Sequence, residues 1–106
     1  MIEITRIKNE HGENIGFRCL GHAGFAKLGK DIVCAAVSGL VLNTINSIEA
    51  FTEDKFSCAQ EEKSGLVEFI IVSEVSKESA LLMDSLFLGL TNIQRDYGKR
   101  FITVKA

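Results

Sequence analysis

The sequence predicts an α+β domain in which two helices pack against a largely antiparallel sheet. Short segments with alternating apolar and polar residues open the chain and recur in its second half, as expected for strands. Two longer segments repeat apolar residues at the spacing of a helix. Because the strand-like segments come in pairs joined by short turns, they indicate hairpins. The predicted order is ββαββαβ within a single domain that spans residues 1–106.

The first hairpin is predicted over residues 2–20. Residues 2–8 alternate, with Ile2 and Ile4 on one face. The polar segment 9–14 is a turn, and Gly12 is its natural left-handed position. Residues 15–20 alternate again and form the returning strand.

A loop over residues 21–30 leads into the first helix. Asp31 is a good N-cap residue, and a helical repeat of apolar residues follows it as far as Phe51 or Thr52. With Asp31 as the cap, Cys34 is the third helical residue. The Cys34 thiol would then lie within reach of backbone N–H groups that have no partner inside the helix.

The second hairpin is predicted over residues 54–60 and 66–73, with a solvated turn at 61–65. Residues 66–72 are apolar on both faces apart from Glu68, which favours a central strand. Cys19 and Cys58 occupy alternating positions of their strands that we expect to face the core.

The second helix is predicted over residues 76–97, followed by a short strand at 101–104. Ser76 is its N-cap, and Gly98 stands at the stop position. Residues 81–90 are apolar nearly all round, so this helix needs a cover on more than one side. In so short a chain the expected second cover is another subunit, which makes a homodimer through helix 76–97.

Composition restricts the class of protein. The chain has 12 basic and 14 acidic residues, a net charge of −2, which argues against direct nucleic-acid binding. The apolar run at 80–90 is too short to span a bilayer and contains Asp84, so we expect no membrane partner. Three cysteines, an odd number, and an opening strand in place of a signal peptide favour a reduced cytoplasmic protein.

Cys34 and His22 are the residues with the clearest capacity for chemistry. A thiol at a helix start is biased toward the thiolate, because the helix dipole and free N–H groups stabilise the anion. A histidine in the preceding loop could accept its proton, and the same N–H groups could bind an oxyanion. From the pattern alone, an inert core cysteine beside a solvated loop histidine explains Cys34 and His22 equally well.

Two neighbours have a structural and a functional interpretation each. Asp31 could cap the helix or orient the imidazole of His22, and both could hold. Ser38 lies one turn after Cys34 on the same helical face, where it could donate to the thiolate or substrate, or bond back to a backbone carbonyl.

Two motifs in this region are false leads. Residues 24–31 nearly match the phosphate-binding loop, but Asp31 replaces the hydroxyl residue that would bind magnesium and would repel phosphate. Cys19 and His22 have the spacing of a metal-binding pair, but no second pair accompanies them. We therefore expect neither a metal nor another cofactor.

The segment from Gly21 to Ser38 resembles the signature of the Prp family of ribosomal-processing cysteine proteases. The resemblance rests on Gly21-His22-Ala23 and on Gly29-x-Asp31-Ile32-Val33-Cys34-Ala35-Ala36-Val37-Ser38. Strand order and length are similar to that family over essentially the whole chain.

The resemblance implies a His22–Cys34 dyad in a homodimeric cysteine endopeptidase. Its implied substrate is the precursor of the large-subunit ribosomal protein numbered twenty-seven, from which it removes a short N-terminal extension. Gly21, Asp31 and Ser38 belong to the same motif as supporting residues. The alternative is a non-catalytic module of the same fold that binds ribosomal proteins or the ribosome.

The glycines of the loop indicate a segment that reorders when substrate arrives. Phe25 and Leu28 are apolar residues on an otherwise polar loop, which suggests an apolar groove for a peptide. We therefore expect the substrate-binding loop to include Gly24, Phe25, Leu28 and Gly29.

Overall fold

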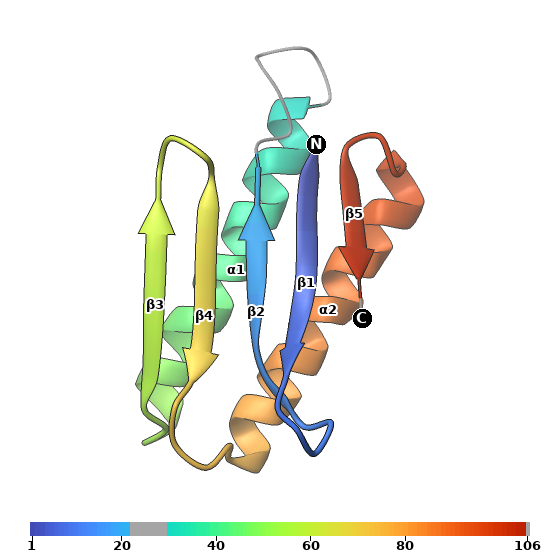
Figure 1. Cartoon of the computed structure of the whole chain (residues 1–106). Coiled ribbons are helices and arrows are strands. Elements are labelled where there is room, and N and C mark those ends of the chain that lie inside the picture. The colour runs from blue at the N-terminus through green and yellow to red at the C-terminus, as the bar shows by residue number, and fades with distance from the viewer. Residues whose placement is uncertain (22–29, 106) are drawn as a thin grey trace.

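The computed structural model describes residues 1–21 and 30–105 and has the predicted order of elements. Five strands form one sheet, and both helices lie on the same face of it (Figure 1). The elements are β1 (Ile2–Lys8), β2 (Asn14–Leu20), α1 (Lys30–Phe51), β3 (Phe56–Glu61), β4 (Leu66–Ile71), α2 (Lys77–Tyr97) and β5 (Ile102–Lys105). The α+β class and the mostly antiparallel sheet are confirmed.

The strand order across the sheet is β3-β4-β2-β1-β5. All neighbouring strands are antiparallel except β1 and β5, which pair in parallel. Strand β4 has a neighbour on each side, as its apolar composition predicted. Strands β4 and β5 run in the same direction, so the connection between them needs a crossover element, which is α2.

The core fills the space between the sheet and the helices. Alternate strand residues point into it, and Phe17 stacks on its cross-strand partner Phe69 with ring centroids 5.2 Å apart. The opposite face of the sheet carries cross-strand ion pairs, such as Arg18 with Glu68 at 3.5 Å. The fold therefore has two layers, with one sheet face left to solvent in this chain.

The start of α2 is fixed by side chains, as the sequence predicted. Ser76 is the N-cap, and its hydroxyl oxygen accepts a hydrogen bond from the backbone N–H of Ser79 at 3.1 Å. Gly98 ends the helix with a φ of 105°, a conformation that favours glycine. The backbone N–H of Gly98 donates to the carbonyl of Gln94, which closes the last turn.

Helix α1 begins at Lys30, so the predicted N-cap at Asp31 is wrong. Asp31 is instead the second helical residue, and Cys34 is the fifth rather than the third. Aspartate is favoured both at the N-cap and in the first turn of a helix, because a carboxylate in the first turn also interacts well with the helix dipole. Composition alone could not distinguish the two registers.

By length and composition, residues Ile32–Phe51 of α1 could cross a membrane. The central helix of a soluble fold has the same composition, and α1 places one apolar stripe in the core. This stripe consists of Val33, Val37, Val41, Ile45 and Ile48.

Candidate active site

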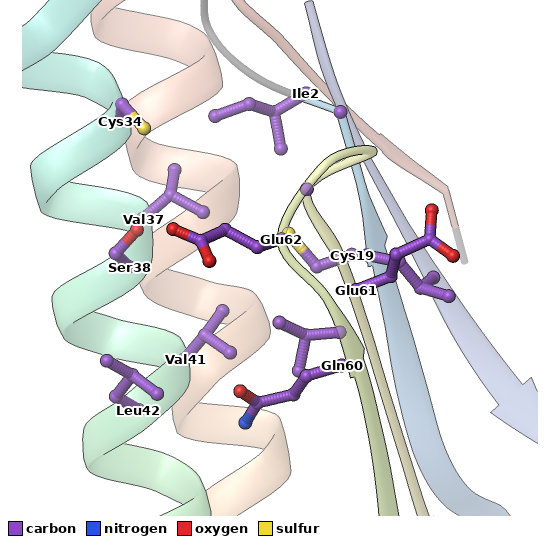
Figure 2. A pocket seen from close by; sticks show the side chains of 14 residues that line it. Ile2, Cys19, Cys34, Val37, Ser38, Val41, Leu42, Gln60, Glu61 and Glu62 are labelled. Carbon is purple, nitrogen blue, oxygen red and sulfur yellow. The ribbon is translucent and has the colours of Figure 1, made fainter.

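A cavity of about 490 Å³ lies between the N-terminal half of α1 and the β3–β4 hairpin (Figure 2). Its walls are mostly apolar, with polar groups from the hairpin turn and from α1. It is lined by Ile2, Cys19, Gly21, Cys34, Val37, Ser38, Val41, Leu42, Gln60, Glu61, Glu62, Gly65, Leu66 and Val67. An apolar cavity with a few convergent polar groups is the usual form of a binding site.

Helical geometry explains why Cys34 faces this cavity. Val33 and Val37 point into the core, and a helix turns about 100° per residue, so the next position lies on the flank toward the hairpin. Cys34, Ser38 and Leu42 follow one another at four-residue spacing along that flank. The Cys34 side chain is half-buried, and its sulfur points toward the cavity in Figure 2.

Ser38 provides a hydroxyl group on the same wall. Among the described residues it forms no hydrogen bond, whereas Thr44 on the same helix donates to the carbonyl of Leu40 at 2.8 Å. The interpretation of Ser38 as a residue that bonds back to the helix therefore finds no support. Its hydroxyl can hydrogen-bond to a ligand in the cavity.

Cys19 is the second thiol in the cavity wall, at the base of the site. It is buried, as predicted, and burial together with the nearby Cys34 raises the pKa of its thiol from 9.0 to about 11. Cys19 is therefore protonated at neutral pH. A thiol in this state is a poor nucleophile, so Cys34 is the better candidate of the two.

Gly21 follows β2 and is linked to the β3–β4 turn by a backbone hydrogen bond. Its N–H donates to the carbonyl of Ser64 at 3.1 Å, and its φ is +94°. A Cβ atom at this position would lie 2.5 Å from the carbonyl oxygen of Met1. Only glycine fits, which gives Gly21 a structural role at the edge of the cavity.

Several predicted site residues lie outside the described part of the chain. These are His22, Gly24, Phe25, Leu28 and Gly29, together with the side chain of Asp31. The structure brings Cys34, Ser38 and Gly21 to one cavity. Within residues 1–21 and 30–105, no group of three His, Cys, Asp or Glu side chains could hold a metal ion.

The hairpin wall of the cavity was not predicted. The segment 61–65 has the composition of an ordinary solvated turn, yet Glu61, Glu62 and Gly65 line the site. Cys58 was expected in the core and is exposed instead. Both errors have one cause: β3 is an edge strand, and α1 leaves a cavity over this hairpin rather than covering it closely.

Comparison with known families shows to which family the chain belongs. The model of the family described as cysteine protease Prp matches residues 1–102. The chain belongs to this family. It is a cysteine protease, which argues against the alternative of a non-catalytic binding module.

Individual relatives agree with this assignment. The ribosomal processing cysteine protease Prp of Bacillus subtilis is 30% identical over 102 residues, which cover 92% of this chain and 90% of that protein. The crystal structure of SMU.848 from Streptococcus mutans is 33% identical, with a TM-score of 0.83 over 99% of this chain and 92% of the other.

The fold is also that of a protease solved with peptide. The ribosomal processing protease Prp from S. aureus, in complex with a substrate peptide, has a TM-score of 0.88 over 100% of both chains, at 22% identity. The likeness extends over the whole chain, so every strand and both helices belong to the shared fold.

Proposed function

We propose that this cysteine protease removes the N-terminal extension of the large-subunit ribosomal protein numbered twenty-seven. Cys34 is the nucleophile, and His22 is the general base and then the general acid. The observation that carries the proposal is the Cys34 sulfur at the wall of an apolar cavity large enough to hold peptide side chains. The names of the curated relatives, ribosomal processing proteases, support the substrate class.

The proposed chemistry is a two-step acyl transfer. The Cys34 thiolate attacks the scissile carbonyl carbon and forms a C–S bond, and the oxyanion that results is bound by N–H donors. The C–N bond then breaks, and the His22 imidazolium protonates the leaving amine. In the second step His22 takes a proton from water, which attacks the thioester and releases Cys34.

The structure of α1 affects where the oxyanion donors come from. Because Cys34 is the fifth helical residue, the free N–H groups of the first turn belong to residues before it. The substrate carbonyl therefore has to lie on the N-terminal side of Cys34. This agrees with a cavity whose apolar part extends from Cys34 in the opposite direction, along Val37, Val41 and Leu42.

The decisive experiment is cleavage of peptides that cover the N-terminus of the host's own ribosomal protein twenty-seven, followed by mass spectrometry. We expect one cut that releases the extension. Cys34→Ala and His22→Ala should each abolish it without unfolding the protein. Cys58→Ala and His11→Ala are matched controls, because both side chains are exposed and lie outside the cavity lining.

The outcomes separate the parts of this proposal. Retained cleavage by either dyad variant contradicts the assigned residues. If the ribosomal peptide stays intact while other peptides are cut, the proposed substrate is contradicted and the protease activity is not.

We further propose a homodimer through α2. Leu81 and Leu88 are seven positions apart on one face of this helix and are 70% and 65% exposed. Two leucines displayed in this way favour a protein partner, and a second copy of the chain is the simplest one.

Light scattering at micromolar concentration should give twice the 11.6 kDa of one chain. The double variant Leu81→Glu and Leu88→Glu should give a monomer, and Val72→Glu, at another exposed apolar residue, should not.

The cellular setting is part of the same proposal. Cys19, Cys34 and Cys58 are free, which suits a reducing compartment, and we place the protein in the cytoplasm. The net charge of −2 favours a peptide substrate without direct nucleic-acid contact.

A further inference from the structure

The β3–β4 turn presents two glutamates to the cavity in different ways. Figure 2 shows the Glu62 side chain extending from the turn toward α1, at the level of Val37 and Ser38. The carboxylate of Glu61 points away from α1. Strand alternation explains Glu61, which ends β3 on the outer side of the hairpin, one position after the inward Gln60.

Among the residues that the structure describes, the wall that the Glu62 carboxylate faces carries no positive charge. The described part of the cavity lining contains Glu61 and Glu62 and no basic residue. In the described ranges, Glu62 takes part in none of the ion pairs, which occur at Arg6, His11, Arg18, Arg95 and Lys105. Opposite it, α1 offers the apolar side chains of Val37 and Val41 and the hydroxyl of Ser38.

This arrangement changes when a peptide fills the cavity. In the free protein Glu62 is exposed, so water solvates its carboxylate. A peptide side chain seated on Val37, Val41 and Val67 removes part of that water and lowers the local dielectric. The carboxylate then needs a cation or a strong hydrogen-bond donor from the peptide itself.

We propose that Glu62 is a specificity-determining residue, which binds the ammonium or guanidinium group of a basic residue on the substrate. The preferred peptide places an apolar side chain in the cavity and a lysine or arginine close to it in sequence. Glu62 selects such peptides by ion pairing and rejects those with an acidic residue there by repulsion. The proposal rests on the proposed protease function but not on the identity of the ribosomal substrate.

A peptide library tests Glu62 separately from the ribosomal substrate. Wild-type protein and the Glu62→Gln variant are each incubated with the library, and the cut peptides are identified by mass spectrometry. We expect lysine and arginine to be enriched near the cut for the wild type, and the enrichment to disappear in Glu62→Gln. Glu53→Gln is the matched control and should keep it, because it removes the same charge from an exposed side chain that is not part of the cavity lining.

Kinetics on a pair of library peptides then measures the contact. For a peptide that differs only by lysine or glutamine at the enriched position, Glu62→Gln should lower kcat/KM on the lysine form by about threefold to tenfold, mainly through KM. The glutamine form should be cut equally by both proteins.

Charge reversal gives the opposite preference if the contact is direct. Glu62→Lys should favour a peptide with glutamate at the enriched position over its lysine form. Absence of basic enrichment in the wild type, the same enrichment in Glu62→Gln, or equal losses on both peptides would overturn the proposal. If the ribosomal peptide is not cleaved but the preference for basic residues in the library remains, only the substrate proposed above is contradicted.

Discussion

The face of the sheet that the helices cover is packed differently at its two ends, and the difference locates the site. We call the part over β1 and β5 the closely packed side and the part over β3 and β4 the open side. On the side of β1 and β5, α2 is tied directly to the strands: the guanidinium of Arg6 lies 4.1 Å from the ring centroid of Phe87 and 3.1 Å from Asp84. Gln94 accepts a hydrogen bond from the backbone N–H of Val104 at 2.7 Å. On the side of β3 and β4, α1 leaves a cavity instead. The cavity, with the Cys34 side chain in its wall, therefore lies on the open side.

The largest expected effect is on the closely packed side. Leu90 of α2 is fully buried, with 0% exposure. Leu90→Ala removes its contacts and leaves a cavity, so we expect the free energy of unfolding to fall by about 2–5 kcal/mol in a urea titration. A loss below about 1 kcal/mol would mean that this side is packed no better than the other.

The second effect concerns the thiols of the open side. A pKa of about 11 against the ordinary 9.0 leaves Cys19 with about one hundredfold less thiolate at neutral pH. Iodoacetamide should therefore label Cys19 last of the three thiols, as measured by peptide mapping. The proposed dyad with His22 should make Cys34 the first to react, ahead of the exposed Cys58. Labelling of Cys19 should rise about tenfold per pH unit until pH 11. Fast labelling of Cys19 at pH 7 would show that the cavity floor is open to reagent.

The third effect tests the start of α2. Asp54 accepts hydrogen bonds from the N–H of Ser76 at 3.0 Å, its hydroxyl at 2.7 Å and the hydroxyl of buried Ser79 at 2.5 Å. Burial raises the pKa of the Asp54 carboxyl, but these hydrogen bonds outweigh it, and the pKa lies below 3.8. Asp54→Asn should lower the free energy of unfolding by about 1–3 kcal/mol at pH 7.

The pH dependence of Asp54 has a definite sign. Because its folded pKa is lowered, its contribution is complete above the unfolded value of 3.8 and is lost as the pH falls through the folded pKa. Urea titrations between pH 5 and pH 2 should show a smaller decline for Asp54→Asn than for the wild type. Glu53→Gln, next to it and exposed, is the control and should follow the wild type.

Sequence predicted best the features that depend on neighbouring residues. The Ser76 cap, the Gly98 stop and the positive φ of Gly12 follow from local hydrogen bonds and backbone sterics. Cys19 faces the core because strand alternation is strict. Each signal lies within a few residues of the feature it determines.

Features set by distant parts of the chain could not be predicted in this way. The parallel pairing of Ile2 with Ile102 joins the two ends of the chain. Cys58 alternates as a core residue would, and its exposure follows from the position of α1 over β3 and β4. Glu62 lies in a turn of ordinary composition, and its place in the cavity wall depends on the same helix position.

The smallest expected effect on stability is at Leu42, the open side's counterpart of Leu90. Leu42 lines the cavity and is 47% exposed, so Leu42→Ala should lower the free energy of unfolding by less than about 1 kcal/mol. It should raise KM for a cleaved peptide by about threefold to tenfold, because it removes apolar contact area. Leu42→Met should keep most of the affinity, and Phe51→Ala, an exposed apolar residue at the end of the same helix, should change neither quantity. A large loss of stability with unchanged KM would mean that this wall of the cavity serves the core and not the substrate.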